Sequence, residues 1–576
     1  MTSPVYTILN QCQDCYKCVR HCPVKAIRIV NGNASVISEA CVACGECVKV
    51  CPVGAKKIRS DLARLRTLLD SGEKLYASVA PSFTGYFPGV SIEQLAGALK
   101  AIGFAGVSET AHGAQVVSTR VSSLLAVDAP PPVMISSACP ACVDYIRRYA
   151  PAWAPYIAPV PSPVRAHVGL LRERLDPTAK VVFIGPCAAK KNESDAHGDE
   201  LLLAVTFASL ERLLEEQGVI LRQVAPSALA LGPAAEGRFY SIEGGMNDTL
   251  RDGGDRIRYV AVSGLENLRQ LLAVPPPASD GGGRPIFIEA LACPGGCVNG
   301  PAMKDRCSLA TLLATDAQAP IRPSRTAETC AAVDYPAAAA AVCRHAEADI
   351  AAALARVGKT SKAAEVNCGA CGYESCRAFA EALLDGKAEV EMCHTYLKQN
   401  FQRTSNALIR YIPAAVVIVG PGGTVLECNR HFADLVGVGV AFEALGTIEG
   451  MSISDLLPEF AGLFAGALEH GSEIEKFRQP LGKRLVNVSV FSITQGESAG
   501  AVIQDVSRNE MQREQVAAKA REVIRQNVRT VQEVARLFGE HIAETEIMLN
   551  EIAGTYESKT VGVSYNGGDS ESYLNG

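Results

Sequence analysis

The stretch "CQDCYKCVRHCP", residues 12–23, has the same cysteine spacing as a second stretch, "CVACGECVKVCP", residues 41–52. Both stretches follow the pattern C-x2-C-x2-C-x3-C-P. The whole chain has 576 residues and 21 cysteines. Cysteines that repeat at short, fixed intervals are typical of metal-binding loops. These two stretches therefore decide the fold of residues 1–60, which we expect to wrap around metal centres.

Length, net charge and composition limit the number of domains, the partners and the cellular location that can be expected. A chain of 576 residues is too long for one hydrophobic core, so about three to five domains are expected. The net charge is −6 without a long basic run, which argues against nucleic acid or an anionic membrane as a partner. The start of the chain lacks the charged and apolar regions of a signal peptide, and no apolar run approaches the roughly 20 residues of a membrane helix. We expect a cytoplasmic protein, whose thiols stay reduced.

The two cysteine runs resemble the bacterial ferredoxin motif for two [4Fe–4S] clusters, in which the fourth cysteine of each run ligates the other cluster. One cluster then takes Cys12, Cys15, Cys18 and Cys51, and the other takes Cys41, Cys44, Cys47 and Cys22. Between the runs, "AIRIVNGNASVI" predicts two short strands around an Asn-Gly turn. Two zinc sites are the alternative, but their usual ligand spacing is different. Electron transfer is the expected function of residues 1–60.

Residues 72–345 alternate apolar strand-like runs with helical stretches, which predicts an α/β domain. Four of the runs share one form: "LYASVAPSF", "PVMISSACP", "KVVFIGPCAAKK" and "RPIFIEALACPGGC". Each is an apolar strand that ends in a proline-containing loop, and the last three loops carry cysteine. Ligands of open α/β sheets bind beyond the carboxyl ends of the strands. We expect these loops to build one buried site.

Three of these loops resemble the signature loops of the [FeFe]-hydrogenase catalytic domain. They are "SSACP" at 136–140, "GPCAAKKNE" at 185–193 and "ACPGGCVNG" at 292–300. The resemblance covers roughly residues 1–400. It implies an H-cluster: a [4Fe–4S] cluster held by Cys139, Cys187, Cys293 and Cys297, bridged through Cys297 to a diiron unit with CO, CN⁻ and dithiolate ligands. That unit would bind H2 and split it into a proton and a hydride equivalent.

The same resemblance implies roles for residues around the diiron unit. Lys190 matches the lysine that contacts a cyanide, and Glu193 matches a nearby glutamate. Pro81 and Ser82 fall where the family lines the other cyanide. A buried anionic ligand needs donors, and a lysine ammonium suits it. A solvated Lys190–Lys191 pair after the strand is the alternative.

The chain departs from the family beside the first ligand. Active hydrogenases carry a second cysteine directly before it, which passes protons because a thiol titrates near neutrality. Here the residue is Ala138, and a methyl group neither gives nor takes a proton. Cys142 stands where the family has an aromatic residue, and we expect it to face the core. Gly185 and Leu291 replace methionines, so we expect slow turnover with H2 binding retained.

A further cysteine motif follows at residues 355–402. Its spacing is C-x2-C-x4-C-x16-C, and its members are Cys368, Cys371, Cys376 and Cys393. It resembles the small [4Fe–4S] domain of corrinoid and carbon-monoxide enzymes. A zinc site with the same four ligands is the alternative. The expected cofactors are thus three [4Fe–4S] clusters and an H-cluster.

The rest of the chain has no clustered cysteines. Residues 405–506 contain strand, turn and helix patterns that resemble a PAS domain, a sensing and dimerising module. Residues 507–553 form a long charged helical pattern with an apolar seam, suited to a coiled coil or to packing on the PAS sheet. The last stretch, 554–576, is rich in Gly and Ser and is expected to be disordered.

Together the parts resemble the sensory, PAS-linked [FeFe]-hydrogenases. The expected fold class is multidomain α/β and α+β: a ferredoxin-like domain, a hydrogenase domain, a small [4Fe–4S] domain, a PAS domain and a signalling helix. The expected partners are H2, protons, a redox partner such as ferredoxin, maturation proteins and a kinase, phosphatase or regulator, with a possible homodimer. Two alternatives stay open: a metabolic ferredoxin-coupled hydrogenase, and an iron–sulfur assembly protein without a diiron unit.

Overall fold

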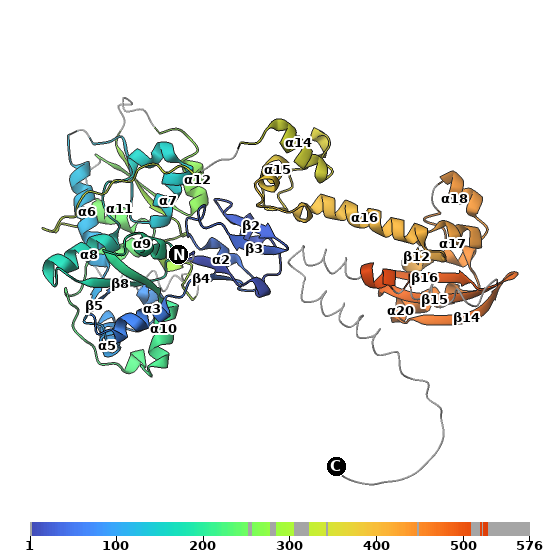
Figure 1. Ribbon diagram of the computed structural model, residues 1–576, viewed down its shortest axis with the longest axis horizontal. Coiled ribbons are helices and arrows are strands. Elements are labelled where there is room, and N and C mark those ends of the chain that lie inside the picture. Colours follow the sequence, from blue (N-terminus) through green and yellow to red (C-terminus); the bar gives the residue numbers. More distant parts are fainter. Residues whose placement is uncertain are drawn as a thin grey trace, which may run out of the picture. The chain divides into compact units, whose positions relative to one another are not determined.

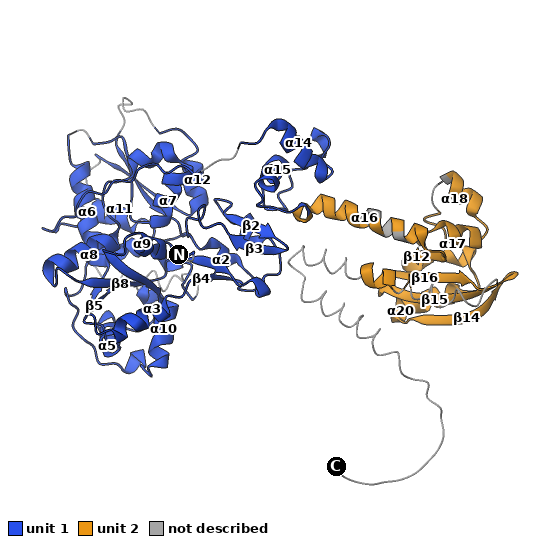
Figure 2. Ribbon diagram, viewed as in Figure 1, with its two compact units in different colours: residues 1–390 blue, residues 391–576 orange. Residues whose placement is uncertain are grey.

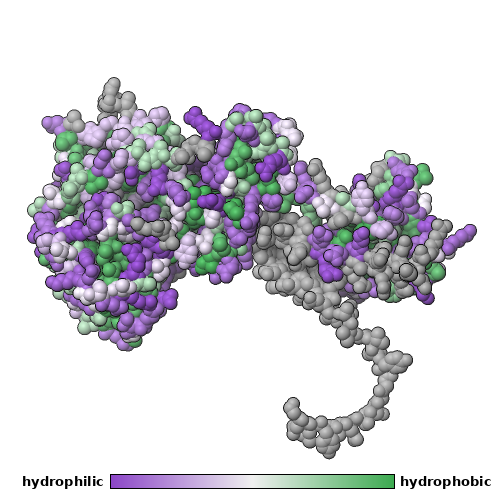
Figure 3. All heavy atoms as spheres, viewed as in Figure 1, coloured by the Kyte–Doolittle hydropathy of each residue, from purple (hydrophilic) through white to green (hydrophobic). Residues whose placement is uncertain are grey.

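The protein divides into two compact units in the computed structural model, residues 1–390 and 391–576 (Figure 2). The structure describes residues 3–128, 130–251, 256–276, 284–304, 322–340, 344–445, 448–507, 519–520 and 522–527. Within these residues no helix is both long and apolar enough to cross a bilayer. On the face of the first unit seen in Figure 3, hydrophilic and hydrophobic residues are interspersed.

The first unit begins with the cysteine-rich domain (Figure 1). Strand β1 (Val5–Thr7) pairs antiparallel with β4 (Lys56–Ile58) and closes the domain, while β2 (Ile27–Val30) and β3 (Asn33–Val36) form a hairpin. The turn residues Asn31 and Gly32 have φ of 50° and 68°, the left-handed region that an Asn-Gly turn requires. The expected hairpin is therefore present. The short helices η1 (Leu9–Gln11), α1 (Lys17–Arg20) and α2 (Glu46–Val50) complete the domain.

The next domain contains two separate parallel sheets. One has the order β6 (Gly106–Glu109), β5 (Leu75–Val79), β8 (Lys180–Gly185), β9 (Leu201–Thr206). The other has the order β10 (Arg258–Ser263), β11 (Ile286–Leu291), β7 (Val133–Ile135). The four loop-bearing strands of the sequence are thus split two and two. Apolar alternation identified the strands, but it carries no information about which strands pair.

Helices surround these sheets and connect their strands. They are α3 (Leu62–Asp70), α4 (Phe83–Tyr86), α5 (Ile92–Ala101), α6 (Ala111–Leu125), α7 (Pro140–Tyr149), α8 (Pro163–Arg174), α9 (Ala189–Ala196), α10 (Phe207–Glu216), α11 (Gly245–Leu250) and α12 (Leu265–Leu271), with the 3-10 turns η2 (Pro151–Tyr156), η3 (Leu221–Gln223), η4 (Glu236–Ser241) and η5 (Cys297–Asn299). Helix α5 begins with a capping box, because Ser91 and Gln94 satisfy each other's backbone N–H groups.

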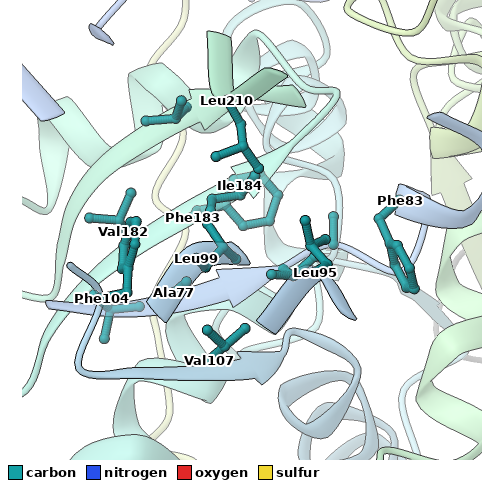
Figure 4. Packing of buried hydrophobic residues seen from close by; sticks show 14 of the residues in the cluster. Ala77, Phe83, Leu95, Leu99, Phe104, Val107, Val182, Phe183, Ile184 and Leu210 are labelled. Atoms are coloured by element: carbon teal, nitrogen blue, oxygen red, sulfur yellow. The ribbon is translucent and has the colours of Figure 1, made fainter. Parts of the chain in front are cut away.

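The largest core lies around the four-stranded sheet (Figure 4). Phe183 and Ile184 of β8 and Leu99 of α5 are at most 4% exposed. Burying such side chains contributes about 1.5–3 kcal/mol each. This core fixes the ends of β5 and β8, from which two of the expected site loops emerge.

A small domain ends the first unit. It contains α14 (Glu347–Arg356), η6 (Lys362–Ala364) and α15 (Cys376–Leu384), and the turn η7 (Val390–Met392) follows at the boundary of the units. Helices α14 and α15 pack through Ile350, Leu354 and Ala380. Ser375 caps α15 by accepting a hydrogen bond from the Ala378 N–H.

The second unit is built on one antiparallel sheet of five strands. Helix α16 (His394–Tyr411) leads into it, and the strand order is β13 (Val425–Cys428), β12 (Ala415–Val419), β16 (Ser498–Asp505), β15 (Arg484–Thr494), β14 (Ile474–Leu481). The turn η8 (Pro421–Gly423) and the helices α17 (Arg430–Leu435), α18 (Gly439–Leu445), α19 (Ile453–Leu456) and α20 (Ala461–His470) lie between strands. Most of the expected helix at 507–553, and all of 554–576, lie outside the described residues.

Candidate functional site

Four cysteines from three loops come together at the carboxyl ends of the parallel strands. Cys139 is the N-cap of α7, Cys187 lies between β8 and α9, Cys293 follows β11, and Cys297 opens η5. Their thiols lie within electrostatic reach of one another. Burial raises the pKa of Cys187 to about 11 and that of Cys297 further. The four expected ligand residues thus lie close together in the interior of the domain.

The turn before Cys297 depends on glycine. Gly296 has φ of 104°, and a Cβ there would lie 2.5 Å from the Ser241 carbonyl oxygen. The loop then packs on the loop that carries Cys187, since the Ala302 N–H donates to the Pro186 carbonyl at 3.1 Å. Close backbone packing around the site therefore requires the second glycine of "CPGGC", Gly296.

Lys190 points its ammonium toward this place. It is 7% exposed and donates to Ser162 Oγ at 2.9 Å and to Glu193 Oε2 at 2.6 Å. Its charge lies within reach of the Cys139, Cys187 and Cys297 thiols. Lys191 is also buried, but it bonds Asp61 at 2.7 Å. The solvated-pair interpretation of the two lysines is therefore wrong.

Pro81 and Ser82 lie just after β5. The Ala80 N–H donates to the Ile184 carbonyl at 2.9 Å, which holds this loop beside the end of β8. Ser82 is fully buried, and its Oγ has no hydrogen-bond partner among the described residues. A buried hydroxyl left unpaired costs about 1–3 kcal/mol, which fits a donor placed for a bound acceptor.

The structure shows the contacts of two residues that depart from the hydrogenase pattern, Ala138 and Gly185. Ala138 packs its methyl group against an apolar cluster, and its N–H donates to Ser136 Oγ at 3.2 Å. A Cβ on Gly185 would lie 2.5 Å from the Phe183 ring, so a methionine here would require that ring to shift. Cys142 is fully buried and faces the core, as expected. The Cys142 thiol also donates a hydrogen bond to the Cys139 sulfur, and this hydrogen bond lowers the pKa of Cys139 to about 6.

Two buried charged residues, one beside the four-cysteine site and one beside the thiols of the first domain, were not singled out from the sequence. Glu289 of β11 is 1% exposed; its Oε2 accepts from the Asn247 N–H at 3.0 Å, and its Oε1 has no partner among the described residues. Burial raises the pKa of Glu289 to about 7. The signal was present, because a glutamate interrupts the apolar strand "IFIEAL". Lys56, 2% exposed, reaches Cys18, Cys41 and Cys47 electrostatically from the end of β4.

The eight cysteines of the first domain form two groups. Cys18 lies within electrostatic reach of Cys12, Cys15 and Cys51. Cys47 lies within reach of Cys22, Cys41 and Cys44. These are the two sets that the ferredoxin spacing predicts, with the fourth thiol of each run exchanged.

The second of these groups borders the four-cysteine site. Ala43 and Cys44 pack in one cluster with Ala141, Cys139 and Cys187. The Tyr149 hydroxyl donates to the Ala40 carbonyl at 2.6 Å, and a Cβ on Gly45 would overlap the Pro301 ring. The first domain is therefore docked on both the Cys139 loop and the Cys297 loop.

The third motif begins in the small domain. Cys368 and Cys371 lie before α15, Cys376 opens it, and the Cys376 N–H donates to Asn367 Oδ1 at 2.8 Å. Cys393 is buried and belongs to the second unit, directly before α16. Among the described residues, no three His, Cys, Asp or Glu side chains stand where one metal ion would be held.

Three family models match the chain. "Iron only hydrogenase large subunit, C-terminal domain" matches residues 73–252 and 237–301. The chain carries the C-terminal domain of the iron-only hydrogenase large subunit. A "4Fe-4S dicluster domain" matches residues 4–52, and a "Putative Fe-S cluster" matches residues 365–394. The iron-only hydrogenase match is thus flanked by two iron–sulfur matches.

Solved [FeFe]-hydrogenase structures are similar to part of this chain. A variant of HydA1 from Chlamydomonas reinhardtii is 18% identical, covering 45% of this chain and 88% of its own, with a TM-score of 0.37. HydA(deltaEFG), solved in a study of stepwise H-cluster assembly, is 20% identical with the same coverage and a TM-score of 0.36. The PAS domain of an HTR-like protein from Haloarcula marismortui is 18% identical, covering 19% of this chain and 98% of its own, with a TM-score of 0.15. No curated protein matches the chain significantly.

Proposed function

We propose that this protein senses H2 with a slowly turning-over [FeFe]-hydrogenase site and passes the signal through a PAS-type second unit to a regulatory partner. The observation that carries the proposal is Ala138 directly before Cys139. The ligand thiols, Lys190 and the buried Ser82 hydroxyl are retained, whereas the proton-carrying thiol is not. Such a site favours binding over turnover.

The residues present fit the H-cluster. Cys139, Cys187, Cys293 and Cys297 would hold its [4Fe–4S] part, and Cys297 would bridge to the diiron unit. When installed by maturation proteins, the diiron unit supplies the place where H2 binds and is split. Lys190 and Ser82 would donate to its anionic ligands, and Glu193 fixes the position of Lys190. Burial of these donors keeps water from competing with them.

The thiol groups of the ferredoxin-like domain would provide a path for electrons to and from the hydrogenase site. The second thiol group of the ferredoxin-like domain borders the hydrogenase loops through Cys44 and Ala43. The first group, with Cys12, Cys15, Cys18 and Cys51, would exchange electrons with a partner such as ferredoxin.

The second unit supports the sensory part of the proposal. Its antiparallel sheet places the first strand, β12, between β13 and the last strand, β16, with helices α17–α20 inserted between β13 and β14. This arrangement suits a PAS-type module. Helix α16 connects Cys393 to β12, so a change at the third cluster has a short covalent route to the sheet.

Infrared spectroscopy of matured, anaerobic protein tests the proposal. Bands of CO and CN⁻ that shift when argon is replaced by H2 are expected. If fully iron-loaded, matured protein shows no such bands, the hydrogen proposal falls. A protein truncated after residue 404 should keep the bands and lose H2-dependent responses in the cell. If those responses persist, the second unit has no part in signalling.

A further inference from the structure

The small domain contacts the ferredoxin-like domain at two places. At one, Lys387 and Glu389 accept hydrogen bonds from backbone N–H groups of the β2–β3 hairpin. The other is the loop between Cys368 and Cys376. Lys25 donates to the carbonyl of Gly372 at 2.8 Å and to those of Val19 and Arg20 at 3.2 and 3.3 Å. Arg20 also donates to the Ala370 carbonyl at 3.4 Å. The loop between Cys368 and Cys376 is thereby fixed to the helix that carries Cys18 and leads to Cys22.

The two backbones approach closely at this point. Gly372 has φ of 91°, and a Cβ there would lie 3.0 Å from Val19 Cγ1 and 3.2 Å from the Arg20 nitrogen. Lys25 itself adopts the left-handed region, with φ of 48°. That conformation is strained for a lysine, and its three carbonyl acceptors hold it there. The sequence of each loop is therefore adapted to this contact.

A tyrosine lies at the centre of the contact. Tyr373 is 5% exposed, and its hydroxyl has no hydrogen-bond partner among the described residues. The hydroxyl lies within electrostatic reach of both the Cys371 and the Cys22 thiols. Lys25 lies over the Tyr373 ring at 6.0 Å and reaches the same two thiols. A buried donor and a cation thus face two ligands from two different cluster motifs.

We propose that Lys25 and Tyr373 form an electron-transfer junction between the cluster that contains Cys22 and the cluster that contains Cys371. Both act as positioning residues, because they adjust and join the two clusters without taking part in bond changes. This inference rests on the proposed iron–sulfur clusters. It assigns a direct exchange that does not pass through the group of Cys12, Cys15, Cys18 and Cys51.

The step is a one-electron exchange. One cluster loses an electron and is oxidised, and the other gains it and is reduced; the protons of Tyr373 and Lys25 stay in place. The electrons come from H2, which releases two electrons and two protons at the hydrogenase site. Tunnelling falls steeply with distance, so a contact between two cluster-bearing loops offers a short route. A cation and an O–H donor stabilise the more negative, reduced state of a cluster.

Redox titration followed by electron paramagnetic resonance on the full chain tests the junction. In the wild type, the reduced clusters of Cys22 and Cys371 should show magnetic coupling. Tyr373→Phe should lower the reduced-to-oxidised ratio of the Cys371 cluster at a fixed potential by about tenfold, or ~59 mV for one electron. Lys25→Met should lower that ratio for both clusters. The signal of the Cys371 cluster is assigned by its loss in Cys368→Ser.

Matched variants serve as controls. Tyr411→Phe removes a hydroxyl from a residue that is 87% exposed, and Lys57→Met removes an exposed charge from β4. Neither should move the titration curves. Uncoupled signals, or curves that Tyr373→Phe and Lys25→Met leave unchanged, would overturn the junction. If the infrared bands are present in that case, the proposed function stands; shifted curves without the bands overturn the proposed function and leave the junction in place.

Discussion

The Lys190 ammonium lies 2.6 Å from the carboxylate of Glu193, three residues further along α9. Both side chains are about one-tenth exposed, and Ser162 accepts a second hydrogen bond from the ammonium at 2.9 Å. A buried cation needs such partners, because an unpaired charge in the interior is costly. Glu193 therefore holds the Lys190 ammonium in place within reach of the Cys139, Cys187 and Cys297 thiols.

Replacing Lys190 should prevent stable installation of the diiron unit. Lys190→Met removes the charge and the donor while keeping the chain length of the side chain, and we expect at least a tenfold loss of the CO and CN⁻ bands. Glu193→Gln keeps a hydrogen-bond acceptor for the ammonium and should cost less. The neighbouring Lys191→Met is the contrast: Lys191 bonds Asp61, so this change should lower stability by about 3 kcal/mol. Infrared intensity per iron separates the two effects, and equal band loss in both lysine variants would contradict the assignment.

Ala138→Cys should increase turnover. A thiol at this position restores a group that gives and takes a proton near neutral pH, and such a group contributes about 10²–10⁴-fold. H2 uptake with an artificial electron acceptor measures the gain. Ala138→Ser is the matched control, since its hydroxyl is similar in size but does not ionise in this range. If the cysteine variant is no faster than wild type, the chain uses another proton route, as the metabolic alternative requires.

Glu289 should make the first unit less stable as the pH rises. Its folded pKa of about 7 lies above the ordinary 4.5, so the native state keeps a proton that the unfolded state has released. Burial is the main cause, and Asp248 adds to it, while the backbone N–H groups of Asn247, Met246 and Gly244 oppose it. Stability should therefore fall between about pH 4.5 and 7, by roughly 3 kcal/mol in total.

Glu289→Gln should remove this loss. Its Tm should exceed that of the wild type at pH 8 and match it more closely at pH 5, because the amide is neutral throughout. The control is Glu200→Gln, since Glu200 has a lowered pKa and bonds Arg165. Its effect should be the same at pH 5 and pH 8. A gap between wild type and Glu289→Gln that does not change with pH would contradict the pKa assignment.

Asn429 should couple α16 to the sheet of the second unit. Its amide donates to the Ile409 and Ala414 carbonyls at 3.0 and 2.7 Å and accepts from the Val416 and Phe432 N–H groups at 2.9 Å each. It thereby joins α16, β12 and α17. Asn429→Ala leaves buried groups unpaired, and we expect a loss of about 2–4 kcal/mol in the stability of this unit.

Hydrogen exchange at the end of α16 measures this coupling. Exchange should rise near residue 409 in Asn429→Ala and stay unchanged in Asn400→Ala, an exposed asparagine of the same helix. If both variants behave like the wild type, α16 and the sheet are coupled by other contacts.

The cysteine positions were the most predictable part of the protein. Short, fixed spacing places thiols in loops, and the ferredoxin pattern predicts which thiol of each run joins the other group. Cys22 and Cys51 lie in the expected groups because the pattern encodes the exchange directly. The Asn31-Gly32 hairpin was predictable for a similar reason, since the turn requires left-handed backbone at both residues.

Long-range pairing was not predictable. Nothing in "PVMISSACP" indicates that β7 pairs with β11 while β5 pairs with β8 in a second sheet. The contact of Lys25 with Gly372 joins residues 347 positions apart, and neither residue stands out in its own segment. Burial of Lys191 was equally hidden, because it depends on Asp61, 130 positions away in the chain.

The close packing of Gly45 on Pro301 has a consequence for biosynthesis. A ribosome adds about 5–20 residues each second, so Pro301 is made roughly 12–50 s after Gly45. During that interval all eight thiols of the first domain are already synthesised, while the loops that later cover Cys41 and Cys44 do not yet exist. Iron can therefore reach the thiols of the N-terminal domain before the last hydrogenase loop exists.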